Sequence, residues 1–209
     1  MDNQASDYKI SGYKVSATIV IICLNAAAFL GVEITGGSED LGHMIACGAA
    51  YAPLIAQNNE YYRLFSCMFL HFGMTHLINN MLALYFVGGH LERAVGRLRF
   101  LLIYLAGGLG ASWLSYHRSL QTASMDVSAG ASGAVFSVIG AMIYVLLLNR
   151  GQLEGLTMRQ MVFMAVLSLY FGFTTTGVDN VAHVGGILCG FVLAVILYHR
   201  RRLPGGMTR

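Results

Sequence analysis

Long uncharged apolar stretches alternate with short polar segments along most of the chain. Six of these stretches approach or reach the roughly 20 apolar residues that a helix needs to cross a bilayer. They cover Val15–Val32, Met74–Leu91, Phe100–His117, Ser132–Leu148, Gln160–Thr176 and Asn180–His199. The pattern predicts an all-α, polytopic membrane protein built as a bundle of six transmembrane helices.

The composition favours a lipid environment over water. Of the 209 residues, 56% are hydrophobic and 11% are charged, whereas a soluble domain carries about 25% charged residues. The length fits one domain, so we predict a single domain over 1–209, with tails at 1–14 and 200–209 around a membrane core at 15–199. The net charge of +3 is too small to indicate a nucleic-acid partner.

Basic residues gather on one side of the predicted membrane. If the six spans alternate in direction, eleven of the thirteen Lys and Arg residues fall on the side that holds both termini, and only Arg63 and Arg118 lie on the other. Cytoplasmic loops carry such an excess of positive charge. We therefore predict that both termini are cytoplasmic.

The segment between the first two spans, residues 33–73, lies on the outer side in this topology. It is rich in Ala, Leu, Ile, Met and Tyr, and it predicts short helices in the membrane interface, with Tyr51, Tyr61 and Tyr62 at headgroup level. Cys47 and Cys67 share this segment, and the sequence leaves open whether they are bonded. The four cysteines form no C-x-x-C pair and no metal-ligand spacing, so no metal is expected.

Polar residues recur at the outer ends of the second, fourth and sixth spans. Ser132 opens span four next to Gly133, and His183 lies just before Gly186 in span six. Small residues at four-residue spacing follow in both spans, which lets two helices approach closely. A serine hydroxyl and an imidazole at matched depth are the parts of an activated nucleophile.

The second span adds hydrogen-bond donors at the same depth. His76 and Asn80 are four residues apart and share one helix face. The backbone N–H of Ser132, at a helix N-terminus, is a third donor. Gly130 and Gly133 leave room for a substrate backbone. Donors converging near a nucleophile are typical of an oxyanion hole.

These residues resemble the rhomboid family of intramembrane serine proteases, in its bacterial, six-span form. The resemblance covers nearly the whole chain and rests on three motifs in the family's order: His76-x-x-x-Asn80, Gly130-Ala131-Ser132-Gly133 and Ala182-His183-x-x-Gly186-x-x-x-Gly190. One departure is Tyr62-Arg63, where the family commonly has Trp-Arg.

The resemblance implies a role for each site residue. Ser132 would be the nucleophile and His183 the general base and acid, with no acidic third member. His76, Asn80 and the Ser132 amide would form the oxyanion hole. The resemblance further implies supporting roles for Gly130, Gly133, Phe136 and His71, and helix packing at Gly186 and Gly190. Asp179, four residues before His183, is expected in a water-facing loop and not to orient the ring.

The resemblance also implies substrates, setting and cofactors. Substrates would be other transmembrane proteins, cut in or beside a membrane helix. The setting would be a bacterial inner membrane, with the site opening to the outer side and with no cofactor.

Two other functions fit parts of the pattern. A non-catalytic rhomboid-like protein that binds membrane clients predicts loss of Ser132 or His183, and both are present. A small transporter predicts polar residues near the midplane, whereas here they crowd one end. The absence of His-Glu-x-x-His and of paired aspartates in the spans argues against metalloprotease and aspartyl chemistry.

Overall fold

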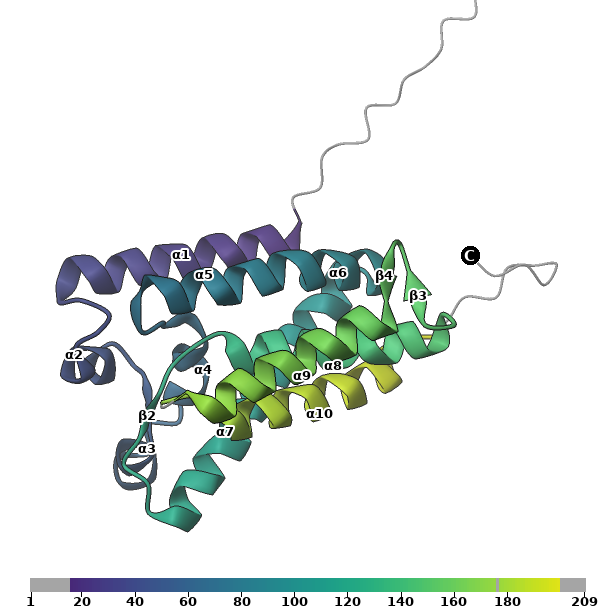
Figure 1. The fold of residues 1–209 in the computed structure, drawn as a ribbon. Coiled ribbons are helices and arrows are strands. Elements are labelled where there is room, and N and C mark those ends of the chain that lie inside the picture. Colours follow the sequence, from purple (N-terminus) through teal and green to yellow (C-terminus); the bar gives the residue numbers. More distant parts are fainter. Residues whose placement is uncertain (1–15, 176, 200–209) are drawn as a thin grey trace, which may run out of the picture.

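Helices account for nearly all regular structure in the computed structural model, which describes residues 16–175 and 177–199 (Figure 1). The α-helices are α1 (Ala17–Thr35), α2 (Leu41–Ala46), α3 (Ala52–Asn58), α4 (Arg63–Ser66), α5 (Gly73–Ala83), α6 (Gly89–Val95), α7 (Arg97–Thr122), α8 (Ser132–Leu148), α9 (Met158–Thr174) and α10 (Asn180–Leu197). A 3-10 turn, η1 (Cys67–Phe69), and a π-helical turn, η2 (Leu84–Gly88), complete the helical part. The strands are β1 (Ala50–Tyr51), β2 (Val127–Ser128), β3 (Gln152–Leu153) and β4 (Leu156–Thr157).

Helices occupy all six stretches that the hydropathy pattern selects. Three of them, α1, α7 and α10, are long and apolar enough to cross a membrane, and α8 and α9 are apolar helices of 17 residues each. The count of six membrane crossings stays a prediction. Val15, Thr176 and the predicted tails at 1–14 and 200–209 lie outside the described residues.

The second predicted span departs from a regular α-helix. It runs through α5, η2 and α6 in succession, and the π turn at Leu84–Gly88 inserts a wider i→i+5 repeat. Leu84, Val87 and Leu91 are all buried along this stretch. The π turn thus keeps one apolar face toward the core while the polar residues of α5 stay at the other end.

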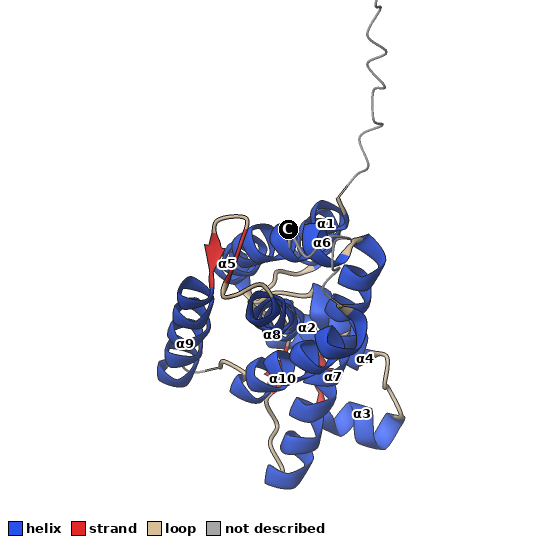
Figure 2. Cartoon of the chain, turned by 90° about the vertical axis from the view of Figure 1, so that its right-hand side faces the viewer, coloured by secondary structure: helices blue, strands red, loops and turns tan. Residues whose placement is uncertain are grey.

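Helix α8 forms the centre of the bundle. Twelve of its seventeen residues are buried, and Figure 2 shows it surrounded by the other long helices. Helix α9 lies at the edge, and its buried residues are Met161, Ala165 and Gly172. The helix that begins at Ser132 is therefore held firmly, whereas α9 presents most of its surface outward.

Helices α8 and α10 pack backbone against backbone. A Cβ atom built on Gly190 would lie 1.9 Å from the carbonyl oxygen of Ser137, and one on Gly186 would lie 2.3 Å from that of Gly133. Such proximity is possible only for glycine. The small residues of α10 thus fix how closely, and at what register, the two helices meet.

Both ends of the described chain lie at one end of the bundle (Figure 1), and Glu92 of α6 anchors the chain there. Its carboxylate accepts hydrogen bonds from the side chains of Ser16 and Thr18 and from the backbone N–H groups of Ala17 and Thr18, at 2.6–2.9 Å. The opposite end, which holds Ser132, is called the Ser132 end below.

The segment between α1 and α5 folds into short helices at the Ser132 end (Figure 1), as the sequence predicts. Buried Arg63 organises it by donating to the carbonyls of Ile45 and Ala49 and by pairing with Glu60 at 2.6 Å. Hydrogen bonds from Asn58 and Arg63 lower the pKa of the Glu60 carboxyl. The ring of Tyr62 is exposed but joins this contact. Its hydroxyl donates to Glu60 Oε2 at 3.1 Å, and the Arg63 guanidinium lies 5.3 Å from the ring centroid.

The two-residue strands were not expected from the sequence. Strands β1 and β2 pair antiparallel, with Ala50 opposite Ser128 and Tyr51 opposite Val127, and so join the interfacial segment to the loop before α8.

Cys47 and Cys67 are free thiols and are not bonded to each other. Cys47 Sγ lies 3.4 Å from His43 Nε2, and Cys67 Sγ lies 3.6 Å from Ser112 Oγ.

Candidate active site

Ser132 and His183 meet where α8 and α10 begin. Ser132 is the first residue of α8, and His183 lies in the first turn of α10. The Ser132 Oγ atom is 3.0 Å from His183 Nε2. The histidine is 7% exposed. The close packing of the two helices brings these side chains, 51 residues apart in sequence, within hydrogen-bond distance.

The imidazole of His183 stacks on the ring of Phe136, which lies one turn after Ser132 in α8. The two rings stack at a centroid distance of 4.2 Å and an angle of 21°. Among the described residues, His183 Nδ1 has no hydrogen-bond partner. With Nδ1 protonated, Nε2 is a lone-pair acceptor pointed at the serine hydroxyl, which is the tautomer that a general base requires.

Two hydrogen bonds hold the loop before Ser132. The Gly130 N–H donates to the Cys67 carbonyl at 2.9 Å, and the Ala131 N–H donates to His71 Nε2 at 3.3 Å. His71 is 1% exposed. Because Ser132 is the first helical residue, its N–H has no acceptor within the helix and remains available to a ligand.

His76 packs against both His71 and the loop. The rings of His71 and His76 meet edge to face at a centroid distance of 5.2 Å. A Cβ atom on Gly130 would lie 2.8 Å from His76 Cε1, and the φ of Gly130 is +153°. Only glycine fits this loop position. Gly133 is similarly confined, since its Cβ would lie 2.9 Å from that of Ala111.

Asn80 lies on the same helix as His76 and is 7% exposed. Its Nδ2 donates to the His76 carbonyl at 3.1 Å. Since an amide nitrogen carries two hydrogens, one of them remains for another acceptor. Among the described residues, no hydrogen bond joins Asn80 to Ser132 directly.

Asp179 does not lie in a water-facing loop, where the sequence led us to expect it, but is hydrogen-bonded within the site. Its carboxylate accepts hydrogen bonds from Ser115 Oγ, from Ser128 Oγ at 2.9 Å and from the Ala182 N–H at 2.9 Å. It is half-buried. An aspartate three residues before Ala182, at the start of an apolar run, is a recognisable N-cap signal. The carboxylate makes no hydrogen bond to the His183 ring among the described residues.

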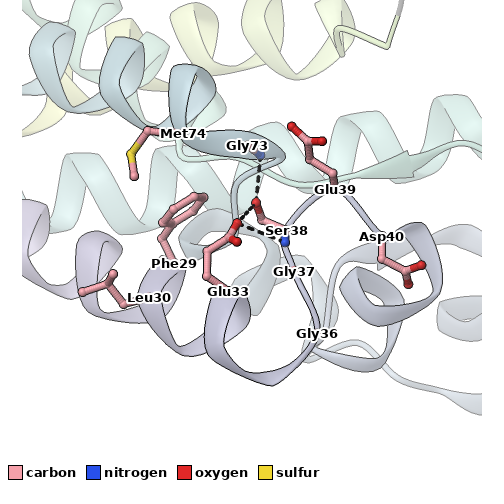
Figure 3. A pocket seen from close by; sticks show the side chains of 10 residues that line it. All are labelled: Phe29, Leu30, Glu33, Gly36, Gly37, Ser38, Glu39, Asp40, Gly73 and Met74. Atoms are coloured by element: carbon pink, nitrogen blue, oxygen red, sulfur yellow. Dashed lines mark hydrogen bonds between the residues drawn. The ribbon is translucent and has the colours of Figure 1, made fainter.

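A separate cavity lies away from Ser132. A space of about 520 Å³ opens between the end of α1 and the start of α5, and its lining includes Glu33, Ser38 and Gly73 (Figure 3). The Ser38 hydroxyl donates to Glu33 and accepts from the Gly73 N–H at 3.1 Å. This serine is thus engaged by a carboxylate, and no histidine or cysteine is among the residues that line the cavity. The cavity therefore holds a serine hydroxyl but no imidazole to activate it, in contrast to the Ser132–His183 pair.

Comparison with known proteins identifies related sequences. Residues 58–200 match the model of the Rhomboid domain. The chain is 40% identical over 184 residues to the rhomboid protease GluP of Bacillus subtilis, which covers 88% of this chain and 35% of the relative. RHOMBOID-like protein 4 of Arabidopsis thaliana is 39% identical over 150 residues, 70% of this chain and 36% of the relative. YdcA of B. subtilis is 30% identical over 146 residues, 69% of this chain and 71% of the relative.

The chain thus spans little more than a third of the length of the first two relatives. The domain match alone covers more than half of the chain. Together with its long apolar helices, the match identifies an integral membrane protein. The chain belongs to the rhomboid family.

Proposed function

We propose that this chain is an intramembrane serine endopeptidase, which hydrolyses a peptide bond in or next to the transmembrane helix of other membrane proteins. The observation that carries the proposal is the distance of 3.0 Å between Ser132 Oγ and His183 Nε2. The stacked Phe136 ring fixes the direction of the imidazole. Such a pair is the minimum needed to activate a serine hydroxyl.

In the first step, His183 Nε2 takes the proton of Ser132 as Oγ attacks the carbonyl carbon of the scissile bond. The tetrahedral intermediate carries its negative charge on the former carbonyl oxygen. His183 then gives the proton to the leaving amine, the C–N bond breaks, and an acyl-enzyme remains on Ser132. Water, deprotonated by the same imidazole, hydrolyses that ester and restores the hydroxyl.

The oxyanion is assigned to the donors around the first turn of α8. The Ser132 N–H points there without a helical acceptor, and the helix dipole adds positive potential at the same point. His76 and Asn80 supply side-chain donors from α5. The Ala131 N–H is excluded, because it is already bonded to His71.

Substrates are proposed to enter from the side of the bundle past α9. This helix presents most of its surface outward. Its last turns lie beside the start of α10, since a Cβ atom on Gly172 would lie 2.4 Å from Asn180 Oδ1. The loop 174–180 therefore belongs to the same entrance. A substrate helix must unwind before its carbonyl can be attacked. Glycine and other weak helix formers lower that cost, so substrates with small residues at the cleavage point are favoured.

The orientation in the membrane follows from the charge distribution, and the bacterial setting follows from the resemblance to bacterial rhomboid proteases. We propose a bacterial inner membrane, with both termini in the cytoplasm and the Ser132 end facing the other side. The site then receives water from outside the cell membrane. A single domain over 1–209 with no cofactor is sufficient for this chemistry.

Labelling by a serine-directed probe tests the nucleophile and its base. A fluorescent fluorophosphonate is expected to modify the purified protein in detergent at Ser132. Replacing His183 by alanine should slow labelling by about 10²–10⁴-fold, because the general base is lost. In-gel fluorescence over time, with mass spectrometry of the modified peptide, gives the rate and the position.

His117→Ala is the matched control for this experiment. His117 is an exposed histidine on α7 that packs against Trp113, with ring centroids 4.6 Å apart. The variant should be labelled at the wild-type rate. Equal labelling of His183→Ala and wild type would contradict the assignment of the base, and a protein that binds membrane clients without cleaving them would not react at Ser132 at all.

Replacing Asn80 by alanine tests the oxyanion hole. The turnover number with a transmembrane substrate is expected to fall by roughly 10²–10³-fold, as when one oxyanion donor is removed. The KM should change little, because the contact strengthens only in the transition state. Steady-state cleavage in detergent measures both. A variant that loses its cooperative thermal unfolding would instead indicate that Asn80 is needed for helix packing.

A further inference from the structure

The carboxylate of Asp179 connects three segments around the site. Ser115 comes from α7, Ser128 from β2 and the Ala182 N–H from the first turn of α10, and all three donate to it. Both serine hydroxyls bond to Oδ2, while Oδ1 caps the helix. The bonds leave the carboxylate with partners on both oxygens.

Asp179 and its partner Ser128 each lie shortly before one of the two reacting residues in the sequence. Ser128 lies four residues before Ser132, and Asp179 lies four residues before His183. The Asp179 backbone carbonyl also accepts the His183 N–H at 3.2 Å. One residue therefore links the strand that leads into the serine to the helix turn that carries the histidine.

We propose that Asp179 is a positioning residue for the hydrolysis assigned above, on which this inference rests. By joining β2 to the first turn of α10, its carboxylate fixes the separation of Ser132 Oγ and His183 Nε2. It acts through the backbone and not as the acid of a triad, since the Asp179 carboxylate is bonded to Ser115, Ser128 and Ala182 while His183 Nδ1 has no partner among the described residues.

The proposed site is built from two separate helix ends, so its geometry depends on how these ends are held relative to each other. Glycine contacts hold α10 against α8 from Gly186, which meets Gly133 beside Ser132, to Gly190. The first turn of α10, which carries His183, precedes Gly186 and is also steered by the loop before it. A charged acceptor bonds more strongly than a neutral one, so a carboxylate suits this linkage. A misplacement of 1 Å costs about 10²-fold in rate.

Three variants separate this role from general stability. Asp179→Ala removes the cap and both links, whereas Asp179→Asn keeps an N-cap side chain of similar strength and removes the charge. The double variant Ser115→Ala/Ser128→Ala keeps the cap and removes the links to α7 and β2. Asp40→Asn is the matched control, because Asp40 caps α2 by accepting from the His43 N–H at 2.6 Å and is not bonded to α8 or α10.

The readout is the turnover number per reactive site, with sites counted by complete fluorophosphonate labelling. Asp179→Ala is expected to lower this number by about 10–100-fold with little change in KM. Asp179→Asn and the double serine variant should also lower the turnover number per site, but by a smaller factor. Asp40→Asn should have the turnover number of the wild type. A merely structural role would reduce the number of reactive sites and the thermal midpoint, and would leave turnover per site unchanged.

Two results would overturn the proposal: wild-type turnover per site in Asp179→Ala, or full turnover in both Asp179→Asn and the double serine variant. Ser132→Ala, assayed with the same substrate and compared per mole of protein, tests the underlying function separately. If Ser132→Ala is inactive while the Asp179 variants are unimpaired, only the positioning role fails. If Ser132→Ala cleaves normally, the proposed function fails and the positioning role with it.

Discussion

Replacing Ser132 by alanine is expected to lower cleavage of a transmembrane substrate by roughly 10⁴–10⁶-fold, the loss seen when a serine nucleophile is removed. The Oγ atom is the only part of the side chain that contacts His183 Nε2, at 3.0 Å, so its loss leaves the base without a proton to take. Folding should be unaffected, because alanine fits wherever serine does. Product formation in detergent micelles, followed by gel electrophoresis, measures the effect.

Ser137→Ala is the matched control, since it makes the same change one and a half turns further along α8. The Ser137 hydroxyl is fully buried and donates to the Ile103 carbonyl at 2.9 Å. Its loss should cost about 1 kcal/mol of stability and leave cleavage unchanged. Normal cleavage by Ser132→Ala would refute the nucleophile, and equal losses in the two variants would point to packing of α8 as the cause.

The course of the long helices could be predicted because hydropathy reports burial in an apolar medium. The predicted range of the fourth span matches α8, whose residues Ser132–Leu148 are uncharged throughout. The π turn at Leu84–Gly88 was missed, because an apolar run looks the same whether its hydrogen bonds are i→i+4 or i→i+5. The pairing of β1 with β2 was missed as well, since strands of two residues carry no alternating pattern.

The candidate site could be predicted only where depth and spacing along a helix determine it. Ser132 and His183 lie beside small residues of two helices, and such residues mark close contacts. The hydrogen bonds of Asp179 could not be predicted, because its partners Ser115 and Ser128 are far from it in sequence. The packing of α7 and of the loop before α8 brings them near. From sequence alone, a charged residue near the end of a span is expected in a water-facing loop. Only the fold shows which hydroxyl groups donate hydrogen bonds to it.

Replacing Gly190 by alanine is expected to separate α8 from α10 and to abolish most of the activity. The added Cβ would lie 1.9 Å from the Ser137 carbonyl oxygen and 2.5–2.6 Å from the Ser137 C and Cα atoms, whereas ordinary contact begins at 3.4 Å. Backbone cannot rotate away as a side chain can, so the helices must move apart. We expect a loss of about 3 kcal/mol in stability, at the upper end of overpacking costs, and about a 10²-fold lower cleavage rate from the displaced histidine.

Gly31→Ala makes the same chemical change where there is space. Gly31 lies within α1, and a Cβ atom there would meet nothing within 4 Å. Its thermal midpoint and activity should equal or exceed those of the wild type, because alanine is the better helix former. The two variants differ only in what the new methyl group meets, so thermal unfolding in detergent and the rate of fluorophosphonate labelling compare them directly. If Gly190→Ala unfolds and reacts like Gly31→Ala, then close contact of α8 and α10 is not what holds the imidazole against the serine hydroxyl.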